Sequence, residues 1–230
     1  MYHDVIPVGD DKQSSGLNIK GADAYKISEK AFEAHVGTAS EIRDKTGQEI
    51  VFTFDDGGKS AILVIAPILD KFNFKGIFFI PSSFIGLPGF LSEDDILNLS
   101  QRGHIIGSHS HFHRLMMNRL PYHDILAEWK MSDEKLSRIV KASIEHASVP
   151  GGWYAPIVAK AASETGIAHL YTSKPIVTQQ NEAYLMVYGR FAIKENMSSQ
   201  FVKSIMEGKN FARQWMLFMY NIGQVVKSFY

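Results

Sequence analysis

Short apolar segments alternate with longer helical segments along most of this chain of 230 residues. The pattern predicts strands at residues 49–54, 75–80, 104–108, 147–149 and 168–172, and over most of 183–193. Strands that alternate with helices of ten or more residues favour a parallel sheet covered on both faces. We therefore expect an α/β fold with parallel strands, either a distorted or incomplete (β/α) barrel or a doubly wound sheet. The length suits a single domain over residues 1–230.

Charge and cysteine content narrow the function classes. Lys and Arg total 24, Asp and Glu also total 24, and the formal net charge is 0, so nucleic acid is not an expected partner. The absence of cysteine excludes disulfides, thiolate metal ligands and a cysteine nucleophile. No stretch approaches the roughly 18 apolar residues of a transmembrane helix. The first ten residues also lack the apolar part of a secretory signal, so we expect a cytoplasmic protein. The oligomeric state is not readable from the sequence.

Two groups of polar residues follow predicted strands, where α/β folds place their chemistry. The first strand ends in Asp55-Asp56-Gly57-Gly58, and the third ends in His109-Ser110-His111-Phe112-His113. Adjacent carboxylates raise one another's pKa unless a cation intervenes. His109 and His113 have the i, i+4 spacing of many zinc sites. Each motif alone has an ordinary interpretation as a turn or a polar loop, but their common position at strand ends favours a site for a hydrolytic metal ion. Zn²⁺ is the default, and Co²⁺, Mn²⁺ or Fe²⁺ suit the same ligands.

These residues also carry a resemblance to a known family. The segment Thr53-Phe54-Asp55-Asp56-Gly57 resembles the first motif of the polysaccharide deacetylases, carbohydrate esterase family 4. The segment 109–113 matches their second motif, H-[ST]-x-x-H, and the similarity covers roughly residues 49–172. The resemblance implies a distorted, incomplete (β/α) barrel that removes acetyl groups, usually from N-acetylglucosamine units of a polysaccharide. It also implies that Asp55 is the catalytic base and that Asp56, His109 and His113 bind the metal.

Two departures from the family pattern concern catalysis. The third motif usually reads R-x-P-[FY], but Ser148-Val149-Pro150-Gly151-Gly152 stands in its place, so the arginine that usually pairs with the base is absent. The late L-x-H motif, which supplies the family's acid, is missing as well, and His169 comes too early to replace it. A P-G-G version of the third motif occurs among relatives. Either another group acts as the acid, or catalysis is impaired.

Candidates for the missing roles lie near both ends of the chain. Arg190 lies in a late predicted strand and could pair with Asp55, although an exposed structural arginine is an equal alternative. His3 follows a possible short strand at residues 1–2 and could reach the same rim as the acid. A frayed terminus is the alternative for His3, and a metal-bound water would then be the acid.

Three further side chains border the motifs. His111 is expected to support its loop rather than to bind metal, because it faces away from its neighbours in an extended segment. Trp153 and Tyr154 follow the Gly-Gly turn, where they could form an apolar wall for an acetyl group or a sugar, and a core position is an equal alternative for Trp153.

The leading interpretation is a metal-dependent carbohydrate deacetylase. One alternative is a catalytically weak or inactive carbohydrate-binding homologue, which the missing late histidine favours. The carboxylate of Asp55 beside that of Asp56 favours the enzyme, because a binding module needs no unliganded carboxylate next to its metal. Another alternative is an amidohydrolase that acts on a small non-sugar amide.

Overall fold

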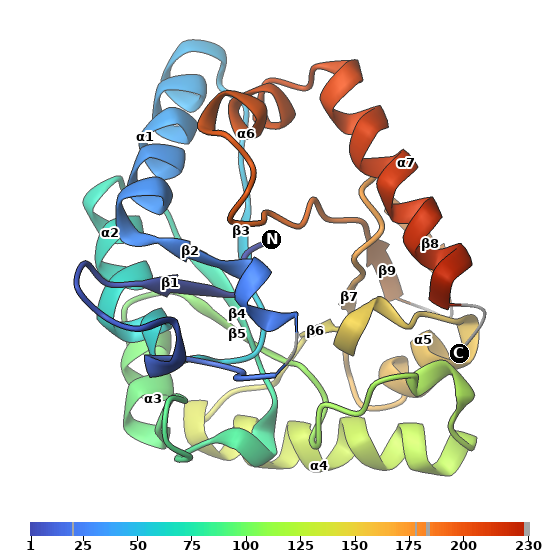
Figure 1. Ribbon diagram of the computed structural model, residues 1–230. Coiled ribbons are helices and arrows are strands. Elements are labelled where there is room, and N and C mark those ends of the chain that lie inside the picture. Colours follow the sequence, from blue (N-terminus) through green and yellow to red (C-terminus); the bar gives the residue numbers. More distant parts are fainter. Residues whose placement is uncertain (20, 178, 183–184, 228–230) are drawn as a thin grey trace.

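A curled seven-stranded sheet forms the centre of the protein, with the strand order β3-β4-β5-β6-β7-β9-β8 (Figure 1). The computed structural model describes residues 1–19, 21–177, 179–182 and 185–227. The strands of this sheet are β3 (Phe52–Phe54), β4 (Gly76–Ile80), β5 (Ile105–Ser108), β6 (His146–Ser148), β7 (His169–Tyr171), β8 (Gln179–Glu182) and β9 (Leu185–Tyr188). All neighbouring strands in it are parallel except the antiparallel pair β8–β9. A separate parallel pair consists of β1 (Asp4–Ile6) and β2 (Lys26–Ser28).

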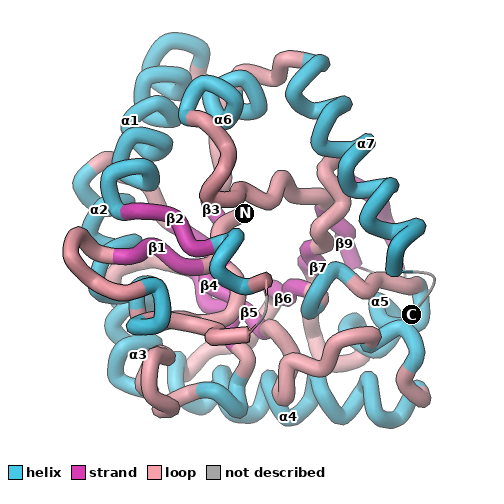
Figure 2. Tube along the Cα trace, viewed as in Figure 1, coloured by secondary structure: helices cyan, strands magenta, loops and turns pink. Residues whose placement is uncertain are grey.

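Helices surround the sheet as an outer ring (Figure 2). They are α1 (Glu29–Thr46), α2 (Ala66–Lys71), α3 (Glu93–Gln101), α4 (Tyr122–Val140), α5 (Pro156–Ser163), α6 (Ser199–Met206) and α7 (Asn210–Lys227). The sheet stays open, because β3 and β8 are its two edges and do not pair with each other. This arrangement confirms the expected distorted (β/α) barrel and not the doubly wound sheet. Among the described residues, no helix is both long and apolar enough to cross a membrane.

Apolar strands bring the ring of helices and the sheet together. All five residues of β4 are buried, as expected for a strand that is covered on both faces. Phe54 of β3 stacks on Phe78 of β4, with ring centroids 4.9 Å apart. Outside the sheet, Ser92 and Asp95 form a capping box that starts α3. The apolar sequence of β4 and the capping box of α3 therefore agree with the positions that these elements take in the fold.

The structure corrects two expectations about strands. Only Leu185–Tyr188 of the segment 183–193 is a strand, and residues 183–184 lie outside the described part of the chain. The strand ends at Tyr188, and at the next residue, Gly189, any Cβ would collide with the backbone oxygens of residues 174 and 176. No strand forms over residues 1–2 either: Tyr2 makes an isolated parallel bridge with Phe54, and β1 starts only at Asp4.

Candidate active site and metal centre

The two carboxylates of the first motif lie directly after β3, in a sharp turn. Asp56 has a φ of 73° and Gly57 a φ of 65°, so two successive residues adopt the left-handed region. Aspartate tolerates this region better than most residues, and glycine enters it without steric cost. The turn gives the carboxylates different partners: Asp55 pairs with Arg190, whereas Asp56 faces the two motif histidines.

Asp56, His109 and His113 converge on one point. An oxygen of Asp56 lies 3.2 Å from Nε2 of His113 and 3.4 Å from Nε2 of His109. One candidate ligand atom from each of the three residues lies within 4.8 Å of the others. Ser110 and His113 both have positive φ angles, 61° and 55°, and these bends return the second histidine to the side of the first. The fold thus brings together all three residues that the motifs single out as metal ligands.

The orientation of His109 fits a metal ligand. Its Nδ1 lies 2.9 Å from the backbone carbonyl oxygen of Ser148. A carbonyl only accepts, so Nδ1 carries a hydrogen, and Nε2, which faces Asp56 and His113, is the nitrogen that can bind a metal ion when the ring is neutral. Metal-binding histidines are commonly fixed in this way through their second nitrogen. Two imidazole nitrogens and one carboxylate oxygen form a donor set that suits Zn²⁺ and similar divalent ions.

Electrostatics keep the carboxylate of this cluster ionised. Burial alone would raise the pKa of Asp56, but hydrogen bonds from His109 and His113 hold that pKa well below its usual range. Burial also opposes protonation of His109, whereas the Asp55 and Asp56 carboxylates raise the pKa of its ring above the ordinary value. Asp56 is therefore in the charged form that metal binding requires.

Arg190 pairs with Asp55, one of the two alternatives that its position in the sequence left open. Its two terminal nitrogens donate to the two oxygens of Asp55 at 2.7 and 2.8 Å, and both side chains are buried. The guanidinium lies 5.3 Å from the ring centroid of Phe79 and 5.9 Å from that of Tyr171. Burial would raise the pKa of Asp55, but the Arg190 charge lowers it to about 2. The alternative of an exposed structural arginine is wrong.

Ser148 links this ion pair to the metal-ligand histidine, a role that sequence reasoning missed. Its hydroxyl donates to Asp55 at 3.2 Å and accepts from Arg190 at 2.7 Å, while its carbonyl holds His109. Ser148 stands where the family's third motif carries its arginine. The side chain there is small, and the positive charge beside Asp55 comes instead from Arg190, which follows β9, two strands away from β6 in the sheet.

His3 lines the same cavity as the candidate metal ligands. The cavity has a volume of about 720 Å³, and its lining includes His3, Asp55, Asp56, His109 and His113. The Nδ1 atom of His3 is buried and has no hydrogen-bond partner among the described residues. Burial lowers the pKa of His3, and the carboxylates of Asp56 and Asp55 oppose this effect. His3 is thus packed at the site, and its ring lies 4.6 Å from that of Tyr25.

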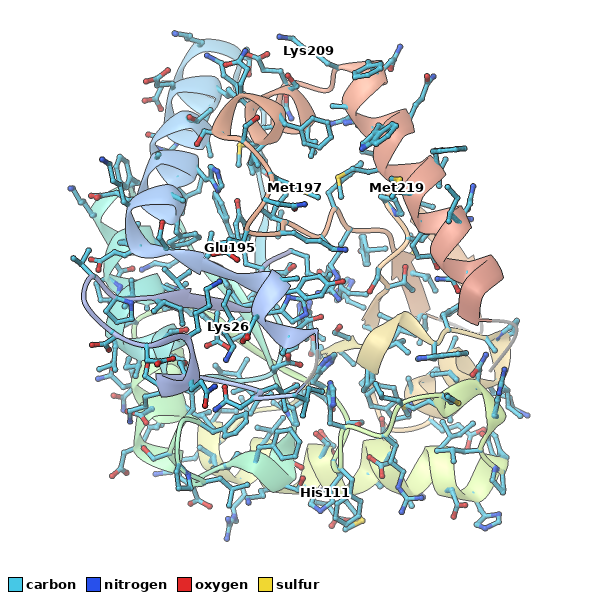
Figure 3. All side chains as sticks on the ribbon, viewed as in Figure 1. Lys26, His111, Glu195, Met197, Lys209 and Met219 are labelled. Atoms are coloured by element: carbon cyan, nitrogen blue, oxygen red, sulfur yellow. The ribbon has the colours of Figure 1, made fainter. Side chains whose placement is uncertain are left out.

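The loop between the two ligand histidines is anchored from outside. His111 points away from the ligand cluster, and Figure 3 places it over α4. Its Nδ1 lies 2.7 Å from the Ser82 hydroxyl, which confirms the expectation that it supports the loop. The buried Glu128 of α4 accepts the backbone N–H groups of His111 at 3.0 Å and Phe112 at 2.8 Å. Sequence reasoning missed Glu128, although a glutamate on the buried face of an amphipathic helix is a usable signal.

A second buried carboxylate supports the first motif. Asp4 accepts hydrogen bonds from Ser15 at 2.6 Å and from Ser60 at 2.7 Å. It packs so closely against Gly16 and Gly58 that a Cβ at either glycine would overlap its carboxylate. Asp4 therefore explains why residue 58, two positions after the candidate metal ligand Asp56, is a glycine even though its φ is not positive.

Trp153 and Tyr154 separate after the Gly-Gly turn. Gly151 and Gly152 have φ angles of 58° and 68°, which redirect the chain. Trp153 lines the cavity, in agreement with an apolar wall. Tyr154 instead packs against the apolar cluster formed around α4 and α5 and does not line this cavity.

Comparison with known proteins supports the motif resemblance. Residues 42–170 match the family described as polysaccharide deacetylase. YxkH of Bacillus subtilis (strain 168), provisionally assigned as a polysaccharide deacetylase, is 25% identical over 198 residues, which cover 79% of this chain and 70% of YxkH. The structure of BC0361, a polysaccharide deacetylase from Bacillus cereus, has a TM-score of 0.73 at 20% identity, and the match covers 89% of this chain and 67% of that one. A de-N-acetylase from Aggregatibacter actinomycetemcomitans has a TM-score of 0.67 at 18% identity, over 86% and 94% of the two chains.

The family match spans more than half of the chain and contains Asp55, Asp56, His109 and His113. His3 and Arg190 lie outside the matched residues, at opposite ends of the sequence. At 20% and 18% sequence identity, the two solved structures support a shared fold and nothing further. On the family match, this chain belongs to the polysaccharide deacetylases, hydrolases that act on carbon–nitrogen bonds other than peptide bonds and remove acetyl groups from carbohydrates.

Proposed function

We propose that this protein is a metal-dependent deacetylase that removes N-acetyl groups from a carbohydrate or polysaccharide. The observation that carries the proposal is the position of Asp55 beside the Asp56–His109–His113 cluster. Its Oδ2 lies 3.9 Å from Nε2 of His109, while Arg190 holds both of its oxygens. A buried, ionised carboxylate that is aimed at a metal-ligand cluster is suited to general base catalysis.

Asp56, His109 and His113 would hold the divalent ion, and Zn²⁺ is the first choice among the ions that suit these donors. When bound there, the ion would polarise the acetyl carbonyl and lower the pKa of water to about 7. Asp55 accepts the proton of the attacking water. Because the pKa of Asp55 is about 2, its carboxylate is a weak base, and the transfer requires a water of increased acidity. This requirement supports a metal-dependent reaction.

His3, in the protonated form that the Asp55 and Asp56 carboxylates favour against the effect of burial, is proposed as the acid that protonates the leaving nitrogen. An amine leaves poorly unless its nitrogen receives a proton, whereas the alcohol of an ester depends less on such protonation. A histidine in the cavity therefore supports an N-acetyl substrate. The similar Aggregatibacter protein is also named as a de-N-acetylase.

The structure gives no specific support to the two alternative functions. Arg190 holds Asp55 beside the candidate ligand cluster without making Asp55 one of the three ligands. A binding module has no use for such a carboxylate. A small non-sugar amide would fill little of a cavity of about 720 Å³, which is within the upper range for ligand pockets.

Acetate release from N-acetylated and O-acetylated oligosaccharides, with and without added Zn²⁺ or Co²⁺, tests the proposal. We expect release from the N-acetylated substrates only after metal is added. Asp55→Asn should lower kcat by about 10²–10⁴-fold while metal affinity is retained. His3→Ala should lower the rate on amides more than on esters. Turnover in the presence of a strong chelator, or an unchanged rate in Asp55→Asn, would contradict the proposal.

A further inference from the structure

The cavity extends well beyond the metal ligands. Its lining continues from the motif residues to α7, where Trp215, Met219 and Tyr220 form part of the wall. Met197 and Met219, both labelled in Figure 3, come from the segment after β9 and from α7, and both line this cavity. The family match ends at residue 170, so this wall belongs to a part of the chain outside the matched region.

The α7 wall of the cavity is apolar although it is open to solvent. Trp215 is 48% exposed and Met219 47% exposed. On other sides of the cavity, Ile19 and Leu115 are also large, exposed apolar side chains. Exposed apolar groups that gather around one cavity mark a place where a ligand or partner binds.

Charged groups contribute little to the cavity outside the catalytic centre. Among the described lining residues, the only carboxylates are Asp4, Asp55 and Asp56. The Lys26 ammonium is already bound by the carbonyl oxygen of Lys12 at 2.6 Å and by Asn18 at 2.7 Å. The Lys194 ammonium lies over the Tyr25 ring, 5.1 Å from its centroid. The wall formed by α7 therefore suits an uncharged ligand with an apolar face.

We propose that Trp215, with Met219 beside it, contacts a neutral sugar unit adjacent to the unit that is deacetylated. This proposal rests on the proposed function and specifies its substrate as an oligosaccharide or polysaccharide rather than a single sugar. One face of a pyranose ring presents C–H groups, which pack on the flat indole. The continuity of the α7 wall with the metal site, within one cavity, favours the substrate chain as the occupant over a separate protein partner.

The same helix provides a matched control. Phe211 lies one helical turn before Trp215 and is 77% exposed, but it does not line the cavity. If the apolar surface of α7 served a protein partner or a second copy of the chain, Phe211 and Trp215 would both belong to that interface. If Trp215 serves the substrate, only Trp215 should affect the reaction.

The test measures kcat and KM for N-acetylglucosamine oligomers of two to six units with the metal-loaded parent protein, Trp215→Ala, Trp215→Phe and Phe211→Ala. In Trp215→Ala, the loss of kcat/KM should grow with chain length and reach about tenfold for the longest oligomer, mainly through KM. Trp215→Phe should recover part of that loss, and Phe211→Ala should match the parent. An equal loss at every length, or none, would overturn the proposal.

A binding measurement separates this proposal from the proposed function. Isothermal titration of the hexamer into Asp55→Asn, alone and combined with Trp215→Ala, reports binding without turnover. If the parent releases no acetate, yet Trp215→Ala weakens hexamer binding about tenfold, the proposed chemistry is wrong and the binding site stands. If the parent releases acetate and the titration is unaffected by Trp215→Ala, the proposed chemistry stands and the α7 contact is wrong. If the hexamer binds to neither protein, the α7 contact is also wrong.

Discussion

Replacing Arg190 tests the electrostatic design of the site most directly. The parent side chain makes two charged hydrogen bonds to Asp55 and one to Ser148, at 2.7–2.8 Å, and donates to the Thr172 carbonyl oxygen at 3.0 Å. Arg190→Met removes these bonds and leaves the Asp55 carboxylate buried without its cation. Breaking a buried pair from one side costs about 3–5 kcal/mol of stability. Arg190→Lys keeps the charge but not the planar fork, so a smaller loss of about 2–3 kcal/mol follows.

The contribution of the Arg190–Asp55 pair to stability depends on pH through the pKa of Asp55. In the parent, the pKa of Asp55 falls from 3.8 to about 2, so its contribution is fully present above pH 3.8 and is lost as the pH falls through about 2. This shift corresponds to roughly 2–3 kcal/mol, in line with the loss expected on mutation. Without Arg190, burial is unopposed by that cation and raises the pKa of Asp55. The stability difference between parent and Arg190→Met should therefore be larger at pH 7.5 than at pH 4.5.

Urea denaturation in the presence of a chelator, followed by tryptophan fluorescence, measures these losses without a contribution from metal binding. A double-mutant cycle of Arg190→Met with Asp55→Asn should give a coupling free energy of at least about 2 kcal/mol. In acetate release, Arg190→Lys should lower kcat/KM about 100-fold, because Asp55 is no longer aimed. A stability loss below about 1 kcal/mol for Arg190→Met, or a loss that is the same at both pH values, would refute the reasoning.

Three further predictions concern the supports of the site and the pH response of the fold. Glu128→Gln weakens the carboxylate anchor of the histidine loop, so Zn²⁺ affinity measured by chelator competition should fall at least about tenfold, whereas the exposed Glu134→Gln on the same helix should not change it. Gly58→Ala places a methyl group against Asp4 and should lower the free energy of unfolding in urea by about 1–3 kcal/mol; a loss below about 0.5 kcal/mol would speak against the contact. Burial lowers the pKa of His35 to about 4, so the ring is neutral in the fold, and stability should fall as the pH is lowered from about 6.5 toward 4; His35→Gln should reduce that slope, and an identical slope would contradict the assignment.

The sequence alone was sufficient to predict that the candidate metal ligands and the candidate base lie together. Asp55 and Asp56 directly follow one predicted strand, and the 109–113 segment follows another. Parallel strands place their carboxyl ends at a common edge, so a correct strand prediction already brings these side chains together. For Arg190, the same rule left contact with Asp55 and an exposed position as equal alternatives, and the structure shows the contact across 135 residues.

Only the tertiary structure revealed the residues that hold these groups in place. Ser148 bridges the ion pair and His109, Glu128 reaches the histidine loop from α4, and Asp4 fills the space left by Gly58. Local periodicity gives a residue's element and face, but these contacts also depend on how far apart the elements pack and which side chains their surfaces bring together. The exposed Trp215 is the clearest case, because only the placement of α7 beside the cavity makes this residue part of the cavity wall.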